Sequence, residues 1–298
     1  MTFRGTYTAL ITPFRDGAVD WTSLDALVER QIEAGIEGLV PCGTTGESPT
    51  LAEDEQIEII ARVARRAAAR TQVVAGVGSN STHHAVELSR RAADVGATAL
   101  MHVSPYYNRP TQEGLLRHFT QCAAATPLPV LLYNIPGRTG VTIENVTLAR
   151  LADEVGNIVA VKHATGRVDD AADLMQECTM AVLSGDDPIT LPLMSLGAVG
   201  VVSVLSNLAP RAVRRVVNAA LAGDYGSALA AHRATHALAR GLLSMATNPI
   251  PIKTALALQG RCAEEFRLPM CPMPGESRGR LADLLRACES SLLRDEPA

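Results

Sequence analysis

A lysine near the end of an apolar run is the residue best suited to covalent chemistry in this sequence. Lys162 lies in Ile158-Val-Ala-Val-Lys-His-Ala164. The chain has 27 basic residues, and apart from Lys162 and Lys253 all of them are arginine. A lysine amine can lose its proton and attack a carbonyl carbon, whereas arginine stays charged in proteins. The scarcity of lysine therefore makes Lys162 a candidate for forming an imine with a keto group.

The run around Lys162 is predicted to be a strand, and its alternation decides which neighbours share the face of the lysine. Ile158 and Ala160 should lie on the same face as Lys162, while His163 should point away from it, toward surrounding helices. Apolar surroundings disfavour an ammonium group and so favour the neutral, nucleophilic amine. The alternative is a structural ion pair with a buried carboxylate.

Hydroxyl groups follow an earlier apolar run, in Gly43-Thr-Thr-Gly-Glu47. The two glycines allow a tight turn, and free N–H groups together with the hydroxyls of Thr44 and Thr45 suit a small carboxylate. A simple turn with helix-capping threonines explains the same residues equally well.

Three of the five tyrosines fall at the ends of two further apolar runs. Tyr106 and Tyr107 follow one run, and Tyr133 ends the next, with Arg138 close behind it. A phenol can pass protons, and the planar fork of arginine can hold a carboxylate. Each tyrosine alone is more typical of packing, but together with a lysine they favour a site.

Other polar residues give weaker signals. His83 and His84 are neighbours on a predicted helix, so they point in different directions and make a poor metal site. Lys253, in Asn248-Pro-Ile-Pro-Ile-Lys253, is interpreted as a lysine at a helix start or an interface. Ser184-Gly-Asp-Asp187 and Gly200-Val-Val-Ser203 could line a lysine pocket through their backbone groups.

The candidate residues need a scaffold that brings several strand ends together. The expected strands are Thr6–Thr12, Gly38–Cys42, Val73–Val77, Ala99–Val103, Val130–Asn134, Ile158–His163, Ala181–Ser184 and Gly200–Val204, and the clearest helices are Leu24–Glu33, Ala52–Ala69, Ser81–Asp94, Gln112–Ala124, Ile143–Asp153 and Asp169–Glu177. Thr50, with Glu53 three residues later, is expected to form a capping box, and Ser81 an N-cap. Eight strands alternating with helices predict an α/β fold, a (β/α)8 TIM barrel with its site at the carboxyl ends of the strands.

The barrel is expected over residues 1–224, followed by a C-terminal helical extension over residues 225–298 that packs on it as one structural unit. The extension should end in an irregular segment and a final helical stretch around Arg280–Leu293.

Bulk properties exclude several classes of protein. The formal net charge is -4 without a basic stripe, which argues against nucleic acid as a partner. No run approaches the roughly 20 apolar residues that span a bilayer, and no secretory signal is recognised at the start. The six cysteines are scattered without metal-ligand spacing. We therefore expect a soluble cytoplasmic globular protein with free thiols, no metal and no membrane partner.

The chemistry-bearing segments also occur in the order found in a known family. Gly43-Thr-Thr-Gly-Glu47, Pro105-Tyr-Tyr-Asn-Arg-Pro110, Tyr133-Asn134, Arg138-Thr-Gly140, Val161-Lys-His-Ala-Thr-Gly166, Ser184-Gly-Asp-Asp187 and Asn248-Pro-Ile-Pro-Ile-Lys253 extend across nearly the whole chain. The sequence resembles the dihydrodipicolinate synthase (4-hydroxy-tetrahydrodipicolinate synthase) family, within the pyruvate-dependent class I aldolase and N-acetylneuraminate lyase superfamily. Arg138, with the Asn-Pro-Ile-Pro segment and Phe266-Arg-Leu-Pro269, points to the synthase branch.

The resemblance implies condensation of pyruvate with L-aspartate 4-semialdehyde, the committing step toward diaminopimelate and lysine. Lys162 would form the imine, and Tyr133 would shuttle protons through Thr44 and Tyr107, the last from a neighbouring subunit. The pyruvate carboxylate would be held by Thr45, and the semialdehyde carboxylate by Arg138. The backbone groups of Gly185 and Val202 would line the pocket. The resemblance implies no cofactor and a homotetramer built as a dimer of dimers.

Two departures from the family pattern are expected to matter differently. His163 stands where an acidic residue usually follows the lysine, with little effect if it faces outward. In the lysine feedback site of regulated members, Ser48, Asn80 and Tyr106 match the pattern. Glu53, Gln56 and His84 replace two histidines and a carboxylate there. Feedback inhibition by L-lysine should therefore be weak or absent.

Two other functions remain open from the sequence. Another pyruvate-dependent aldolase of the same superfamily would share Lys162, Tyr133 and the two threonines, although Arg138 suits a small carboxylate-bearing aldehyde better than a sugar. A catalytically silent pyruvate-binding paralogue would have no need of all these groups.

Overall fold

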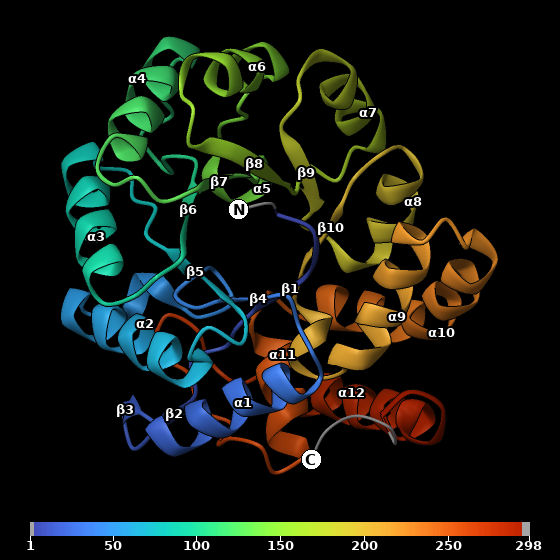
Figure 1. Cartoon of the computed structure of the whole chain (residues 1–298). Helices are drawn as coiled ribbons and strands as arrows, with labels where there is room; N and C mark the ends of the chain where they lie inside the picture. Colours follow the sequence, from blue (N-terminus) through green and yellow to red (C-terminus); the bar gives the residue numbers. More distant parts are fainter. Residues whose placement is uncertain (1–2, 294–298) are drawn as a thin grey trace.

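The structure, a computed structural model, describes residues 3–293. Eight parallel strands close a barrel in the order β1-β10-β9-β8-β7-β6-β5-β4, and helices surround it (Figure 1). The barrel strands are β1 (Gly5–Ala9), β4 (Gly38–Val40), β5 (Gln72–Gly76), β6 (Ala99–Val103), β7 (Val130–Asn134), β8 (Ile158–His163), β9 (Ala181–Ser184) and β10 (Gly200–Ser203). The predicted fold class is confirmed. The largest difference in the strand bounds is at β1, which ends at Ala9 instead of Thr12.

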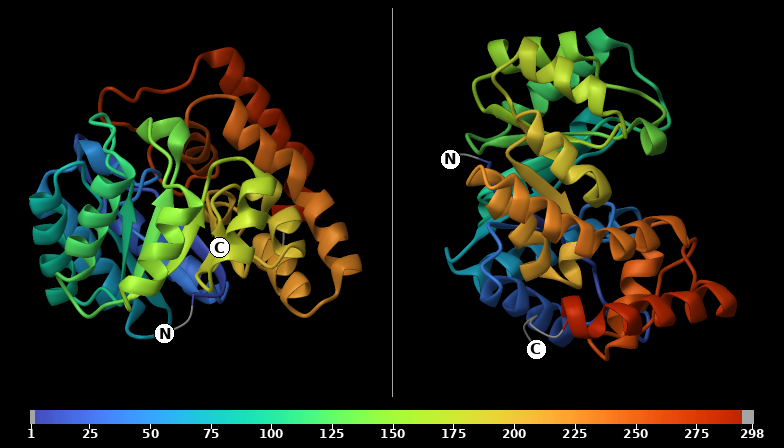
Figure 2. Two further views of the ribbon diagram at one scale, coloured as in Figure 1. Left: turned by 90° about the horizontal axis from the view of Figure 1, so that it is seen from above. Right: turned by 90° about the vertical axis from the view of Figure 1, so that its right-hand side faces the viewer.

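The helices around the barrel follow the alternation expected from the sequence. They are α1 (Trp21–Glu33), α2 (Glu53–Ala67), α3 (Thr82–Asp94), α4 (Gln112–Ala123), α5 (Pro136–Thr139), α6 (Asn145–Glu154), α7 (Val168–Glu177), α8 (Thr190–Ser195) and α9 (Pro210–Leu221). Beyond them, α10 (Tyr225–Ser244), α11 (Ile250–Leu258) and α12 (Gly275–Cys288) form a helical layer against one flank, where α10 packs on α9 and α12 (Figure 2). Within the described residues, no helix has both the length and the apolar character needed to cross a bilayer.

The buried side chains form two separate apolar layers, as expected for a closed barrel. The larger layer fills the space between strands and helices. The smaller one lies inside the barrel and includes Tyr7, Val74, Leu131 and Val202. The strands therefore carry apolar residues on both faces, which explains their continuous apolar runs in the sequence.

A bulge in β8 changes the expected alternation before Lys162. Val130 pairs with Ile158, but the next residue, Leu131, pairs with Ala160, so Val159 is an extra residue. Ile158 consequently packs in the outer layer, and Val159 packs against the inner one. The prediction that Ile158 shares a face with Lys162 is wrong, because a bulge inserts one residue into the period of two. The prediction for Ala160 is confirmed.

Local details near the strand ends also differ from the predictions. A two-stranded hairpin, β2 (Phe14–Arg15) and β3 (Ala18–Val19), was not expected from the sequence. At the start of α2, Glu55 bonds back to the backbone: its carboxylate accepts a hydrogen bond from the N–H of the N-cap residue Ala52 at 2.9 Å, and no side chain caps the helix from Ala52. Thr50 instead ends a short 3-10 turn. At α3 the N-cap Ser81 is confirmed, and α12 begins at Gly275, earlier than expected.

Candidate active site

Lys162 and Tyr133 lie side by side at the carboxyl ends of two neighbouring strands. They are register partners on β8 and β7, and Lys162 Nζ lies 3.9 Å from the centroid of the Tyr133 ring. Both side chains are buried, with 4% of each residue exposed. The structure thus brings together the two residues that were expected to form the imine and to shuttle protons.

The surroundings of Lys162 decide between a free amine and half of an ion pair. Within the described residues, no carboxylate oxygen lies within 4.0 Å of its amine, whereas such pairs are found for many arginines. Asp186 is the acidic residue whose charge interacts with it. Burial raises the pKa of Asp186, and the nearby charge of Lys162 opposes this rise. The alternative interpretation of Lys162 as half of a structural ion pair is therefore disfavoured.

His163 points away from Lys162, as predicted. It is fully buried, and its Nε2 lies 2.9 Å from a carboxylate oxygen of Asp170, at the start of α7. The contact fixes the strand to the helix behind it and does not involve the barrel interior.

The Thr44–Thr45 loop turns tightly directly after β4. Cys42 and Glu47, at its two ends, have φ angles of 57° and 54°, in the left-handed region that residues other than glycine rarely adopt. The turn is closed by hydrogen bonds from the N–H groups of Gly46 and Glu47 to carbonyls inside the loop. On neighbouring β5, a Cβ at Gly76 would lie 2.4 Å from the Cys42 carbonyl oxygen, so the close approach of the loop requires glycine there.

Asn248 joins two residues that were predicted separately as substrate-binding. The side-chain N–H₂ of Asn248 donates to Thr45 Oγ1 at 3.1 Å, and the backbone carbonyl of Asn248 accepts from Arg138 Nη2 at 2.9 Å. Arg138 is exposed in the short helix α5 that follows β7, while Thr45 is buried. Sequence reasoning included Asn248 in a motif but gave it no role, because the contact joins residues 203 positions apart.

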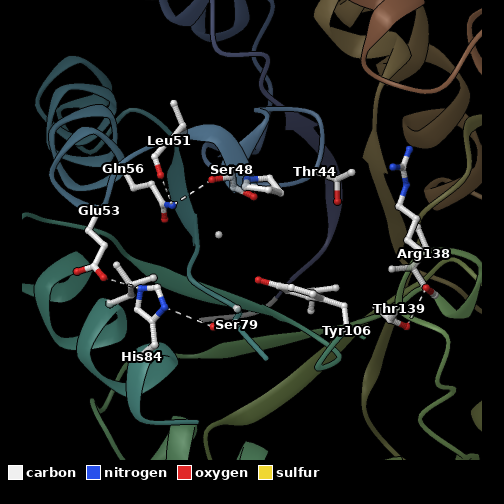
Figure 3. Close-up of a pocket in the computed structure, with 16 residues that line it drawn as sticks. Thr44, Ser48, Leu51, Glu53, Gln56, Ser79, His84, Tyr106, Arg138 and Thr139 are labelled. Carbon is white, nitrogen blue, oxygen red and sulfur yellow. Dashed lines mark hydrogen bonds and ion pairs between the residues drawn. The ribbon is translucent and has the colours of Figure 1, made fainter. Parts of the chain in front are cut away.

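A cavity of about 380 Å³ opens beside these residues. Thr44 and Arg138 line one part of it, and Tyr106 lies between that part and His84 (Figure 3). A second, smaller cavity of about 30 Å³ is lined by both Thr44 and Tyr133. Thr44 therefore contributes to both spaces, one of which it shares with Tyr133 and the other with Arg138.

Tyr107 is not brought to this site within the chain. It is 91% exposed, with a φ of 73°, and its loop is held by Asn80, which donates to the Tyr106 carbonyl at 3.2 Å. Asn108 in turn donates to the Asn80 carbonyl. The loop is thus anchored while the Tyr107 ring projects outward.

Gly185 and Val202 lie on the remaining side of the barrel. The Gly185 N–H donates to the His163 carbonyl at 2.7 Å, and a Cβ at Gly185 would lie 2.5 Å from Ala164 Cβ. Val202 is fully buried in the inner layer. Gly185 directly follows β9, the strand next to β8, and Val202 lies in β10, one strand further along the barrel.

The far end of the large cavity holds the residues that depart from the family pattern. His84 Nε2 lies 3.0 Å from Glu53 Oε1, and Gln56 donates to the carbonyls of Ser48 and Leu51 (Figure 3). No cluster of three or more His, Cys, Asp or Glu side chains within residues 3–293 is arranged to hold a metal ion.

Lys253 was interpreted as a lysine at a helix start or an interface, and the structure adds a partner for it. It lies in the first turns of α11, as predicted, but it is fully buried, and its Nζ contacts Glu47 Oε1 at 2.5 Å. The structural ion pair considered for Lys162 thus occurs at the other lysine.

Comparison with known proteins agrees with this geometry. The model of the dihydrodipicolinate synthetase family matches residues 2–288. The 4-hydroxy-tetrahydrodipicolinate synthase of Pelobacter propionicus is 48% identical over 287 residues, covering 96% of this chain and 98% of that protein. The crystal structure of dihydrodipicolinate synthase from Aquifex aeolicus superimposes with a TM-score of 0.95 at 44% identity, covering 97% of this chain and 99% of that one. The crystal structure of the chloride-inhibited dihydrodipicolinate synthase from Acinetobacter baumannii, complexed with pyruvate, superimposes with a TM-score of 0.93 at 43% identity. It covers 96% of this chain and 99% of that one.

The matches extend over nearly the full length of both partners, and the strand ends that carry Lys162, Tyr133 and Arg138 fall inside them. The chain therefore belongs to the dihydrodipicolinate synthetase family.

Proposed function

We propose that Lys162 is the nucleophile with which this chain condenses pyruvate and L-aspartate 4-semialdehyde. The family assignment makes the chain a lyase, a 4-hydroxy-tetrahydrodipicolinate synthase that acts in lysine and diaminopimelate biosynthesis. The observation that carries the proposal is the pairing of Lys162 with Tyr133 at the barrel's carboxyl end, where no carboxylate among residues 3–293 forms an ion pair with the amine.

The proposed sequence of steps begins with attack of the Lys162 amine on the pyruvate ketone carbon. Loss of water gives an imine, and loss of a methyl proton gives an enamine, whose carbon then adds to the aldehyde of the second substrate. The imine itself accepts the electrons, so no organic cofactor or metal ion takes part.

Proton transfers in these steps are assigned to Tyr133 and its neighbours. The Tyr133 phenol exchanges protons with the bound intermediates, and Thr44 relays them onward. The small cavity that Thr44 and Tyr133 share supports this relay. The partner subunit's Tyr107 completes it, and the 91% exposure of Tyr107 on its own chain supports a role outside that chain.

The two substrate carboxylates are assigned to different residues. Thr45 holds the pyruvate carboxylate with its hydroxyl and backbone N–H, and Arg138 holds the semialdehyde carboxylate with its guanidinium fork. Gly185 and Val202 complete the pocket through backbone groups. The position of Arg138 on the wall of the large cavity supports its assignment to the second substrate.

The assembly and location follow from the same proposal. A role for Tyr107 in a neighbouring site requires self-association, and we assign the chain to a homotetramer built as a dimer of dimers. The six cysteines are all free thiols, which supports a cytoplasmic location.

Borohydride trapping with pyruvate tests the proposal directly. The intact mass should show one reduced pyruvyl adduct, absent in Lys162→Arg, and the peptide map should place it at Lys162 and not at the buried Lys253. Absence of an adduct on the folded protein would remove the imine mechanism and favour the silent paralogue. An adduct without consumption of the semialdehyde would favour another pyruvate-dependent aldolase.

A further inference from the structure

The Glu47–Lys253 pair joins the Thr44–Thr45 loop to the C-terminal extension. Glu47 is the last residue of the loop and lies two positions from Thr45, and Lys253 lies in α11, five positions after Asn248. Lys253 is fully buried, and Glu47 is 2% exposed. The extension therefore contacts the loop through Asn248 on Thr45, through Lys253 on Glu47 and through the Arg267 N–H on Glu47.

The surroundings of the pair hold its two charges in a fixed geometry. Lys253 Nζ lies 4.1 Å from the centroid of the Phe14 ring and 5.0 Å from that of Phe266. Glu47 Oε2 accepts from the Arg267 N–H at 3.3 Å. A buried ammonium ion between aromatic faces and a carboxylate has few alternative positions, because any movement of either charge leaves the other without a partner.

The backbone of the loop requires such a restraint. Glu47 has a φ of 54°, which a residue with a side chain adopts only when its contacts stabilise that conformation. The Glu47 N–H also donates to the Thr44 carbonyl at 3.1 Å, so the position of Glu47 is transmitted directly to Thr44.

We propose that Glu47 and Lys253 are positioning residues for catalysis, which orient the Thr44–Thr45 loop from the C-terminal extension. This inference rests on the proposed function, because it assigns the pyruvate carboxylate to Thr45 and the proton relay to Thr44. The hairpin β2–β3 takes part through Phe14, whose ring contacts the Lys253 amine.

The proposal makes an asymmetric prediction for the two substrates. A displaced loop weakens the pyruvate site and the proton relay, while Arg138 lies in α5, outside the loop, and keeps its contact with the second carboxylate. Misplacement by about 1 Å can cost a large factor in rate, so we expect the KM for pyruvate to rise at least about tenfold. The kcat should fall, and the KM for the semialdehyde should stay near its original value.

A double-mutant cycle separates positioning from stability. Glu47→Gln and Lys253→Met each leave one buried group without its partner, so both should lower the unfolding temperature. The double variant leaves no buried charge, so it should recover the unfolding temperature but keep the raised pyruvate KM. Asp25→Asn is the matched control, because the half-buried pair of Asp25 with Arg62 joins α1 to α2 and not the extension to the loop. It should change stability only.

The rate of borohydride-trapped adduct formation with pyruvate gives a second readout for every variant. Slower trapping in the folded double variant, at unchanged semialdehyde KM, is the supporting result. A double variant with the pyruvate KM and trapping rate of the original protein would overturn the proposal. If the original protein itself forms no adduct, the proposed function fails, which is a different outcome from a double variant that traps pyruvate normally.

Discussion

Lys162 and Tyr133 are direct register partners on adjacent parallel strands, and the amine of one lies 3.9 Å from the ring centroid of the other. The spacing is set by backbone hydrogen bonds of the barrel and not by a flexible loop. The residues that we propose as nucleophile and proton donor are thus held in fixed relative positions before any substrate binds, which would reduce the cost of orienting them in the reaction.

Replacing Tyr133 with phenylalanine should separate proton transfer from packing. The ring would still fill its place beside Lys162, but the phenolic proton would be lost, so kcat should fall about 10²- to 10⁴-fold. Steady-state kinetics measure the loss, and circular dichroism should show an unchanged fold. Tyr225→Phe is the control, because the Tyr225 hydroxyl donates to the Met194 carbonyl and not to Lys162 or Thr44. Equal losses in both variants would contradict the role.

Arg138 should be required for the second substrate and not for the first. In Arg138→Lys the charge remains but the planar fork is lost, so the KM for the semialdehyde should rise by about tenfold or more. Trapping of pyruvate with borohydride should proceed as before. Arg117→Ala, which removes an exposed pair with Glu113, is a suitable control. A matching loss of pyruvate trapping in Arg138→Lys would show that the two carboxylate sites are not separate.

L-Lysine should inhibit this enzyme weakly or not at all. At the far end of the cavity His84 contacts Glu53, and both amide-donor contacts of Gln56 go to backbone carbonyls. No carboxylate stands at position 84 to bind an ammonium group. Initial rates across a lysine titration test this, and loss of half the activity at submillimolar lysine would contradict it. Combining Glu53→His with His84→Glu should increase sensitivity.

Acid should destabilise the fold through a buried histidine behind the site. Burial lowers the pKa of His118 from 6.5 to about 4; its Nδ1 lies 2.8 Å from Thr82 Oγ1. In the unfolded chain His118 takes up a proton near pH 6.5, but in the folded chain it does so only near pH 4. The contribution of His118 to the free energy of unfolding is therefore fully present above pH 6.5 and is lost as the pH falls from 6.5 toward 4. The pKa difference corresponds to about 3 kcal/mol.

Urea unfolding at several pH values measures this dependence. His118→Gln cannot take up the proton, so its free energy of unfolding should fall less steeply below pH 6.5. His236→Gln, at an exposed histidine, should keep the original slope. An unchanged slope in His118→Gln would show that other groups dominate the acid response.

The sequence was informative where chemistry and periodicity coincide, and less so where distant segments meet. Eight apolar runs predicted the barrel because each strand is buried on both faces, and Lys162 could be singled out because lysine is scarce. Three features depended on three-dimensional contacts: the bulge at Val159, the bridge through Asn248, and the burial of Lys253. The last was missed because a lysine at a helix start is usually exposed, and its partner Glu47 lies 206 residues away.

Whether Tyr107 acts on its own chain or on a neighbour can be decided by mixing two inactive variants. Tyr107→Phe retains Lys162, and Lys162→Arg retains Tyr107. If the tyrosine enters the neighbouring site, a hybrid dimer has one complete site, formed by Lys162 of one chain and Tyr107 of the other. Random exchange in a twofold interface should then restore about a quarter of the original activity.

The same mixture also shows whether Tyr107 instead serves the active site of its own chain. If Tyr107 served its own chain, every site in the hybrid would lack one of the two groups, and activity would stay at the level of the separate variants. Refolding the variants together from denaturant ensures exchange, and native mass spectrometry with one isotope-labelled chain measures the hybrid fraction. Activity that rises in proportion to that fraction supports the shared site, because the 91% exposed Tyr107 side chain then has its function in the partner's cavity.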